Sequence, residues 1–195
     1  MDELLDMFLA GSREFGARVH AVAPDRWSAP TPDTEWTVAD LVGHLVEEHR
    51  WCPPLLHGLD LESARKVVAG TRNLPVGGGT GANLAEAWDE AALGSSAAVT
   101  ERGALDRVVD LSRGPTSARQ YLGEMTFDLT VHSWDLARAI GYDRPLPEDL
   151  VGFVYGQVRQ LGDLASTGLF AAAVEVPAGA STIDKLVALT GRAPG

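Results

Sequence analysis

The sequence has little cysteine, few basic residues and no long hydrophobic run. Its single cysteine, Cys52, excludes an internal disulfide, and with it a small secreted domain held together by disulfides. Lysine and arginine number 16 against 27 aspartate and glutamate residues, which gives a net charge of −11 at pH 7. Because nucleic acids and anionic membrane surfaces are recognised by basic patches, this balance argues against both as partners.

We expect neither an export signal nor a membrane-spanning segment. No apolar run approaches the roughly 18 residues that a membrane-spanning helix needs. The sequence opens with Met1, Asp2 and Glu3, where a signal peptide would carry basic residues. We therefore expect a cytoplasmic protein. Hydrophobic residues make up 45% of the 195 residues, enough for a real core, and we expect one domain over residues 1–195.

Helical spacing of apolar residues dominates the first part of the chain. It predicts a helix over residues 4–22 and a second helix that begins after the capping residue Thr37. The second helix is expected to run to about Trp51, where Pro53 and Pro54 end or kink it.

The remaining chain shows the same alternation of helices and links. A glycine-rich passage centred on residues 77–81 lacks the Lys-Ser/Thr continuation of a phosphate-binding loop, so we expect a flexible link. Residues 105–111 fit either extended or irregular structure. Four more helices are predicted: one from Asn83, one from Ser117 to near Gly141, one over residues 150–164, and a short one from Ser181 to before Gly191. The fold class is therefore all-α, a four-helix bundle with a long connection and short C-terminal helical additions.

The predicted helix that follows Ser117 carries three polar residues on its apolar face. Asp128, His132 and Asp135 are spaced i, i+4 and i+7, so they share the face that should be buried. Burying a bare carboxylate costs several kcal/mol unless it is paired or binds a cation. Two acids around one imidazole therefore need an explanation.

Two explanations remain open from this helix alone. In the first, a buried aspartate–histidine pair ties the helix to a neighbour, or the apolar stripe is rotated so that the acids reach water. In the second, Asp128 and His132 are metal ligands from successive turns, and Asp135 is a further ligand or the acceptor that orients His132. A metal site of this type needs at least one more ligand from another element.

The predicted helix that follows Thr37 offers two histidines for that ligand. His44 lies between Leu41 and Leu45, and His49 follows five residues later. The apolar residues of this helix point closer to His49, whereas His44 flanks them. A lone histidine on a helix is more often structural than a ligand, and periodicity leaves both residues open.

Two segments together carry a family resemblance. The first is WTVADLVGHL over residues 36–45, and the second is DLTVHSWDLA over residues 128–137. The pair resembles the DinB-like superfamily, and within it the actinobacterial branch that includes the metal-binding domain of mycothiol-dependent maleylpyruvate isomerase. The similarity in pattern extends from the first helix through Gly141 and more loosely into residues 186–192.

This resemblance implies a fold and a ligand set. The fold is a four-helix bundle with an unusual crossover connection. A divalent metal, Zn²⁺ or Ni²⁺, is held by one histidine of the second helix and an acid-x-x-x-His pair of a later helix, which here are His44, Asp128 and His132. The isomerase has glutamate at the position of Asp128, which is one methylene shorter. The isomerase also has a separate C-terminal domain at its active site, for which 195 residues leave no room, so we expect a substrate other than maleylpyruvate.

Two functions from different classes follow from these observations. In the first, the metal binds and ionises a low-molecular-weight thiol, which by the resemblance is mycothiol, and the thiolate attacks a small electrophile in a transferase or isomerase reaction. In the second, the protein is a non-catalytic metal- or ligand-binding module. The sequence does not decide between them, nor does it give the oligomeric state, for which a homodimer is one alternative.

Catalytic residues beyond the ligands are not assigned. Glu47, Glu48 and Tyr121 are weak candidates for a positioned acid or base, and each fits a solvated or packing residue better. Cys52 has no CxxC partner and lies next to Pro53, so we expect a small hydrophobe there rather than a nucleophile.

Overall fold

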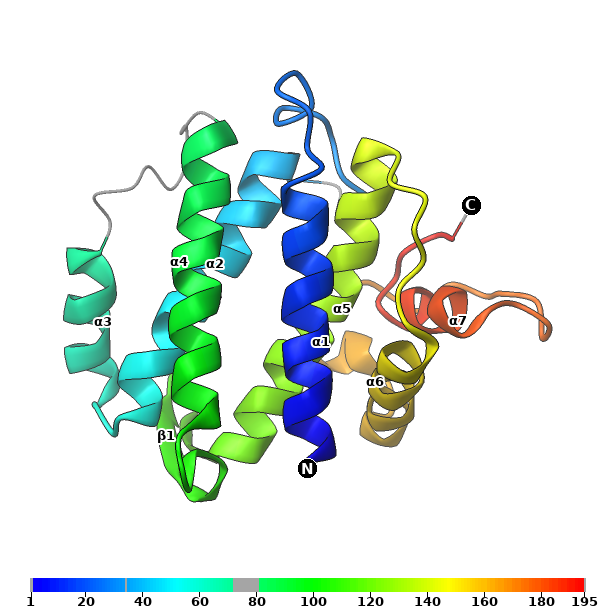
Figure 1. Cartoon of the computed structure of the whole chain (residues 1–195). Helices are drawn as coiled ribbons and strands as arrows, with labels where there is room; N and C mark the ends of the chain where they lie inside the picture. Colours follow the sequence, from blue (N-terminus) through cyan, green and yellow to red (C-terminus); the bar gives the residue numbers. More distant parts are fainter. Residues whose placement is uncertain (1, 34, 72–80, 195) are drawn as a thin grey trace.

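The computed structural model describes residues 2–33, 35–71 and 81–194, and helices dominate this part of the chain (Figure 1), which confirms the predicted all-α class. None of the described helices is both long and apolar enough to cross a membrane. The elements are α1 (Glu3–Val19), α2 (Val38–Leu56), α3 (Leu61–Gly70), α4 (Gly81–Thr100), the 3₁₀ segment η1 (Ala104–Asp106), β1 (Val108–Leu111), β2 (Gly114–Ser117), α5 (Ala118–Ile140), α6 (Glu148–Leu161), the 3₁₀ segment η2 (Leu164–Thr167) and α7 (Thr182–Leu189).

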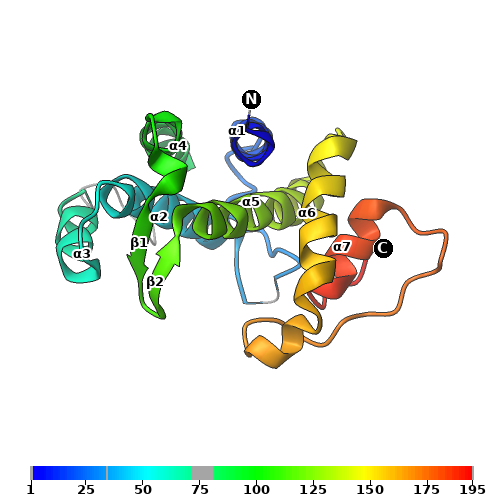
Figure 2. The ribbon, with the colours of Figure 1, turned by 90° about the horizontal axis from the view of Figure 1, so that it is seen from below.

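Helices α1, α2, α4 and α5 form the predicted bundle. The closest packing is between α1 and α5 and between α2 and α4. These pairs are seen from the side in Figure 1 and from below in Figure 2, and α2 and α5 run in opposite directions. The main core takes buried side chains from all four helices: Phe8, Phe15, Leu41, Leu45, Leu84, Trp88, Leu122 and Leu129.

Side-chain caps set the helix ends as the sequence predicts. The Thr37 hydroxyl accepts a hydrogen bond from the Asp40 amide, and the Asp40 carboxylate accepts one from the Thr37 amide. Ser117 caps α5 and Ser181 caps α7 with the same kind of bond. Gly141 ends α5 at a φ of 72°, which favours glycine. These ends set the register of α2 and α5, the helices that carry the candidate site.

The prediction that the second helix ends near Trp51 is wrong. Helix α2 continues through Pro53 and Pro54 to Leu56. Each proline removes one helical hydrogen bond, which disfavours the helix. However, Leu55 and Leu56 lie in the core at 2% and 1% exposure, and burying one leucine contributes about 1.5–3 kcal/mol. Core packing therefore outweighs the local effect of the prolines.

Other element boundaries differ from the prediction in smaller ways. Helix α1 ends at Val19, α6 spans residues 148–161, and α4 already begins at Gly81. Helix α3 was not predicted, because it buries little beyond Ala64 and Val68. Residues 105–111 divide between η1 and β1, which pairs with β2 in an antiparallel hairpin. Most of the glycine-rich passage, residues 77–80, lies outside the described residues.

The predicted C-terminal additions are α6, η2 and α7. They have a hydrophobic cluster of their own, which includes Leu150, Val154 and Leu186 and takes in Val131 from α5. Figure 2 shows α6 and α7 beside one end of α5. Because Val131 belongs to α5, the additions are packed on the helix that carries the candidate site.

Candidate metal centre

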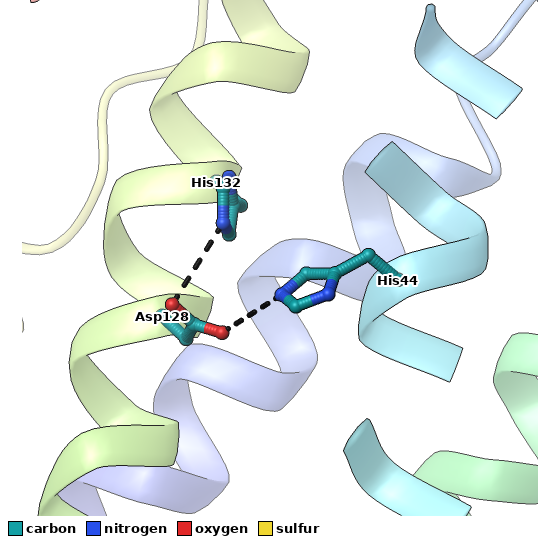
Figure 3. A group of neighbouring side chains, drawn as sticks. All are labelled: His44, Asp128 and His132. Atoms are coloured by element: carbon teal, nitrogen blue, oxygen red, sulfur yellow. Dashed lines mark hydrogen bonds and ion pairs between the residues drawn. The ribbon is translucent and has the colours of Figure 1, made fainter. Parts of the chain in front are cut away.

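Three predicted side chains from α2 and α5 meet at one point. Nε2 of His44 lies 3.1 Å from Oδ2 of Asp128, and Nε2 of His132 lies 3.7 Å from Oδ1 of the same carboxylate. Figure 3 shows both imidazoles directed at Asp128, His44 from α2 and His132 from the next turn of α5. One ligand atom from each residue lies within 4.8 Å of the others, a spacing that suits a single metal ion.

The electrostatics of the group keep its carboxylate ionised. Burial raises the pKa of Asp128, but the hydrogen bond with His44 and the electrostatic interactions with the two imidazoles and with Arg192 outweigh it, so the pKa lies below that of an ordinary aspartate. For His44, burial lowers the pKa, but the bond to Asp128 and nearby acidic charges raise it above the ordinary value. A carboxylate that stays charged at neutral pH is suited to bind a cation.

Asp135 determines which nitrogen of His132 carries a proton. Nδ1 of His132 donates to Oδ2 of the fully buried Asp135 over 2.9 Å. In a neutral ring this leaves a lone pair on Nε2, which faces the Asp128 carboxylate. Two lone pairs facing one another are unfavourable unless a proton or a cation lies between them. The donor set of two imidazole nitrogens and one carboxylate oxygen therefore fits a divalent metal ion.

Arg192, from the chain end after α7, is the site residue that helical periodicity missed. Its Nε and Nη2 donate to the two oxygens of Asp135 over 2.7 and 2.8 Å, and Nη2 also reaches Oδ2 of Asp33 at 2.9 Å. Such a bidentate guanidinium–carboxylate pair is strong and directional. Its one signal in the sequence is the loose resemblance of residues 186–192.

Arg192 also decides between two candidate ligand groups. Asp33, His132 and Asp135 form a second cluster with metal-like spacing. The guanidinium of Arg192 already binds both carboxylates of that cluster, so a cation there would meet a positive charge. The group of His44, Asp128 and His132 has no such cation bonded to its carboxylate among the described residues, and it is the better metal site.

His49, the other histidine of α2, lies in the core. Its Nδ1 lies 2.7 Å from Oγ of Ser95, and its ring stacks on Phe8 and meets Trp88 edge-on. Burial lowers the pKa of His49 to about 3, so the ring is neutral. The apolar residues of the helix point closer to His49 because it is the more buried of the two histidines. Its burial among aromatic rings gives it a structural role.

Comparison with known proteins gives the family of the chain. The sequence model of the family described as mycothiol maleylpyruvate isomerase N-terminal domain matches residues 8–137, which include both resemblance segments. The chain belongs to this family. Arg192 lies beyond the matched residues.

The chain is also similar to proteins without an assigned function. Two uncharacterised proteins of Mycobacterium tuberculosis, one from strain CDC 1551 / Oshkosh and one from strain H37Rv, are each 28% identical to the chain over 140 residues. The match covers 70% of this chain and 66% of each relative, so it spans slightly less than two thirds of their length.

Solved structures show the same fold. The crystal structure of the mycothiol-dependent maleylpyruvate isomerase aligns with a TM-score of 0.62 at 16% identity, covering 85% of this chain and 71% of that chain. A variant of that isomerase with one histidine changed to alanine aligns at 0.59 and 14% identity, covering 80% and 68%. At such low identity the likeness establishes the helical-bundle fold and nothing finer.

The residues considered as an acid, a base or a nucleophile differ in how deeply they are buried. Glu47 and Glu48 are half-buried on α2, and Tyr121 is buried on α5. Burial and the charge of Asp128 raise the pKa of Glu48. Cys52 is fully buried and its pKa is raised to about 12, which agrees with a packing role and leaves it protonated at neutral pH.

Proposed function

We propose that this member of the mycothiol maleylpyruvate isomerase N-terminal domain family binds one divalent ion, Zn²⁺ or Ni²⁺, through His44, Asp128 and His132. We further propose that it acts with mycothiol as a thiol-dependent isomerase or transferase on a small electrophile. The observation that carries the proposal is the convergence of two imidazole nitrogens and one ionised carboxylate at one point. Family membership supports the thiol.

Each residue of the centre has a definable task in this proposal. His44 and His132 present Nε2, and Asp128 supplies the negative charge between them. Asp135 holds the proton of His132 on Nδ1, and the hydrogen bonds from Arg192 hold the Asp135 carboxylate in place. A bound divalent ion would lower the pKa of a coordinated thiol and so provide a thiolate at neutral pH. Three protein ligands leave coordination positions open for that thiol.

Thiol binding to the metal-loaded protein tests the proposal. Protein loaded with Zn²⁺ is titrated with mycothiol by calorimetry in two buffers of different ionisation enthalpy, with metal-free protein as the control. Binding as a thiolate should release about one proton per thiol and tighten as the pH rises toward the free thiol's pKa of about 8.5. If Zn²⁺-loaded protein does not bind mycothiol at any pH in this range, the thiol-dependent reaction is contradicted.

Turnover separates the enzyme from a non-catalytic module. Loaded protein with bound mycothiol is incubated with a panel of small electron-poor alkenes, and loss of free thiol or isomerisation of the double bond is followed. Binding of metal and thiol without reaction of any alkene would favour the binding-module alternative.

A further inference from the structure

The indole of Trp36 lies against both imidazoles of the candidate metal centre. Its ring centroid is 4.8 Å from that of His44 and 5.6 Å from that of His132, and the two imidazole centroids are 5.4 Å apart. Aromatic rings attract one another at centroid distances of about 4.5–7 Å. An indole does not coordinate a metal ion, so its contact with both candidate ligands needs another explanation.

Trp36 is held in place from several sides. Its amide donates to the Asp33 carbonyl over 2.9 Å, and its carbonyl accepts hydrogen bonds from the amide and the hydroxyl of Thr31, each over 3.0 Å. The next residue, Thr37, caps α2, and the half-buried indole packs against the main core. Because a tryptophan ring turns about only two side-chain bonds, the indole is a rigid surface for its neighbours.

The two imidazoles differ in what fixes their orientation. Nδ1 of His132 donates to Asp135 over 2.9 Å. His44 meets Asp128 through Nε2 (Figure 3), and none of the described residues forms a hydrogen bond with its Nδ1. The His44 side chain is also 29% exposed, against 8% for His132. A metal-bound imidazole ordinarily has its second nitrogen held by an acceptor that orients the ring, and among the described residues His44 has the nearby indole instead.

We propose that Trp36 is a positioning residue: its indole holds the His44 imidazole with Nε2 directed into the candidate metal centre, as the Asp135 hydrogen bond does for His132. This inference rests on the proposed function. A ring that is already oriented loses less rotational freedom when its nitrogen binds an ion. Trp36 therefore raises the metal affinity of the site without contributing a ligand atom.

The Zn²⁺ affinity of Trp36 variants, measured by competition with a chromogenic chelator, tests the positioning. Trp36→Leu keeps an apolar side chain but loses the flat ring, and its affinity should fall about 10-fold, the lower end of the loss seen for residues that orient a ligand. Trp36→Phe restores a flat ring and should recover most of the affinity.

Trp134→Leu is the matched control for Trp36→Leu. Trp134 is a half-buried tryptophan of α5 whose ring packs under the guanidinium of Arg138. It follows His132 by two residues and so faces another side of the helix. Trp134→Leu should bind Zn²⁺ as the wild type does.

The background in which Trp36 is replaced shows which ring the indole acts on. Asp135→Asn disturbs the orientation of His132, so Trp36→Leu should cost about the same 10-fold factor there as in the wild type. In His44→Ala no imidazole of α2 is left for the indole to orient, and Trp36→Leu should not weaken the residual Zn²⁺ binding further. A general loss of stability would act in every background alike, so this pattern separates positioning from a structural role.

Fluorescence gives a second readout, which stands even if Trp36→Leu does not fold. Paramagnetic Ni²⁺ quenches an indole in its immediate vicinity, and Trp36 is next to both ligand rings. Ni²⁺ should therefore quench more fluorescence in the wild type than in Trp36→Phe, although both proteins bind the ion. Equal quenching in the two proteins would show that Trp36 is not at the metal and would overturn the proposal.

The affinities can overturn it in three further ways. Equal Zn²⁺ affinity in wild type and Trp36→Leu would refute the positioning role and leave the proposed function intact. A loss in Trp36→Phe or in Trp134→Leu as large as in Trp36→Leu would also refute it, because a flat ring beside His44 would then not be the cause. Wild-type protein that binds neither Zn²⁺ nor Ni²⁺ would refute the proposed function, and the positioning role with it.

Discussion

At the residue scale, the contacts of each histidine determine whether it can be a ligand. His44 and His132 turn Nε2 toward Asp128, whereas His57 is about half exposed at the end of α2 and pairs with Glu101. We expect His44→Ala and His132→Ala each to lower Zn²⁺ affinity by more than about 100-fold, the upper end of the loss seen for residues that only orient a ligand.

Competition with a chromogenic chelator measures this loss. His57→Ala is the matched control and should bind Zn²⁺ like the wild type. If His49→Ala abolishes binding while His44→Ala does not, the ligand from α2 has been misassigned.

The contact between His132 and Asp135 predicts a smaller effect. In Asp135→Asn, the amide oxygen still accepts the Nδ1 proton, but the charge that makes the imidazole a better ligand is lost. Zn²⁺ affinity should fall about 10- to 100-fold. Asp89→Asn, which alters the exposed partner of His20, should leave the affinity unchanged. A loss in both variants would point to a general effect of charge on metal binding.

His49 predicts how stability depends on pH. Its pKa is about 3 in the folded protein and about 6.5 in the unfolded chain. Above about pH 6.5 neither state is protonated, so His49 has no effect there. As the pH falls below this value the unfolded chain takes up the proton first, and stability decreases by roughly 1.4 kcal/mol per pH unit, or about 2 kcal/mol at pH 5.

Urea denaturation at a series of pH values measures this dependence. His49→Gln should be less stable near neutral pH, because it disturbs the packing against Phe8 and Trp88. It should also lose the part of the acid dependence that belongs to His49. An unchanged slope between about pH 6.5 and pH 4 in His49→Gln would show that other groups cause the dependence.

At the element scale, the parts that could be predicted from sequence are those that local chemistry determines. The Thr37 and Ser117 caps and the Gly141 stop each depend on residues within one or two turns. The path of α2 through Pro53 and Pro54 could not be predicted, because it depends on core contacts of the next turn with distant helices. Helix α3 could not be predicted for a different reason: too few of its residues are buried to give a clear helical spacing of apolar residues.

The last turn of α2 gives a test of this explanation. If buried leucines hold the helix together beyond the prolines, Leu56→Ala should destabilise the protein by about 2–4 kcal/mol. Leu93→Ala, at a leucine that is 74% exposed on α4, should change stability by less than about 0.5 kcal/mol. The measurement is the free energy of unfolding in urea. Equal values for the two variants would mean that the last turn contributes little.

At the scale of the whole molecule, the C-terminal additions and the bundle meet at one charge cluster. Arg192 is 57 residues from Asp135 and 159 residues from Asp33, and it joins the end of the chain to α5 and to the loop before α2. No periodic pattern relates residues so far apart, which is why the acid–histidine face of α5 could be predicted from sequence but its cationic partner could not. His44 was reached through the family resemblance, because periodicity left it open against His49.

Because Arg192 joins the C-terminal additions to the bundle, its substitution tests how far the stability of one depends on the other. In Arg192→Met, the fully buried carboxylate of Asp135 keeps its bond from His132 but loses its guanidinium partner. Leaving a buried charge without its partner costs about 3–5 kcal/mol. Unfolding should therefore occur at a lower urea concentration. Arg144→Met is the control, because Arg144 is 55% exposed and its partner Glu14 keeps a second cation, Arg18, so the loss should cost under about 1 kcal/mol.

A double-mutant cycle separates this charge effect from lost packing. If Arg192 acts through Asp135, then Arg192→Met in an Asp135→Asn background should cost much less than in the wild type, because no buried carboxylate is left without a cation. The expected coupling between the two substitutions is about 1–3 kcal/mol. Strictly additive effects would mean that Arg192 stabilises residues 190–194 through Asp33 and Thr190, its other two partners, independently of the candidate metal centre.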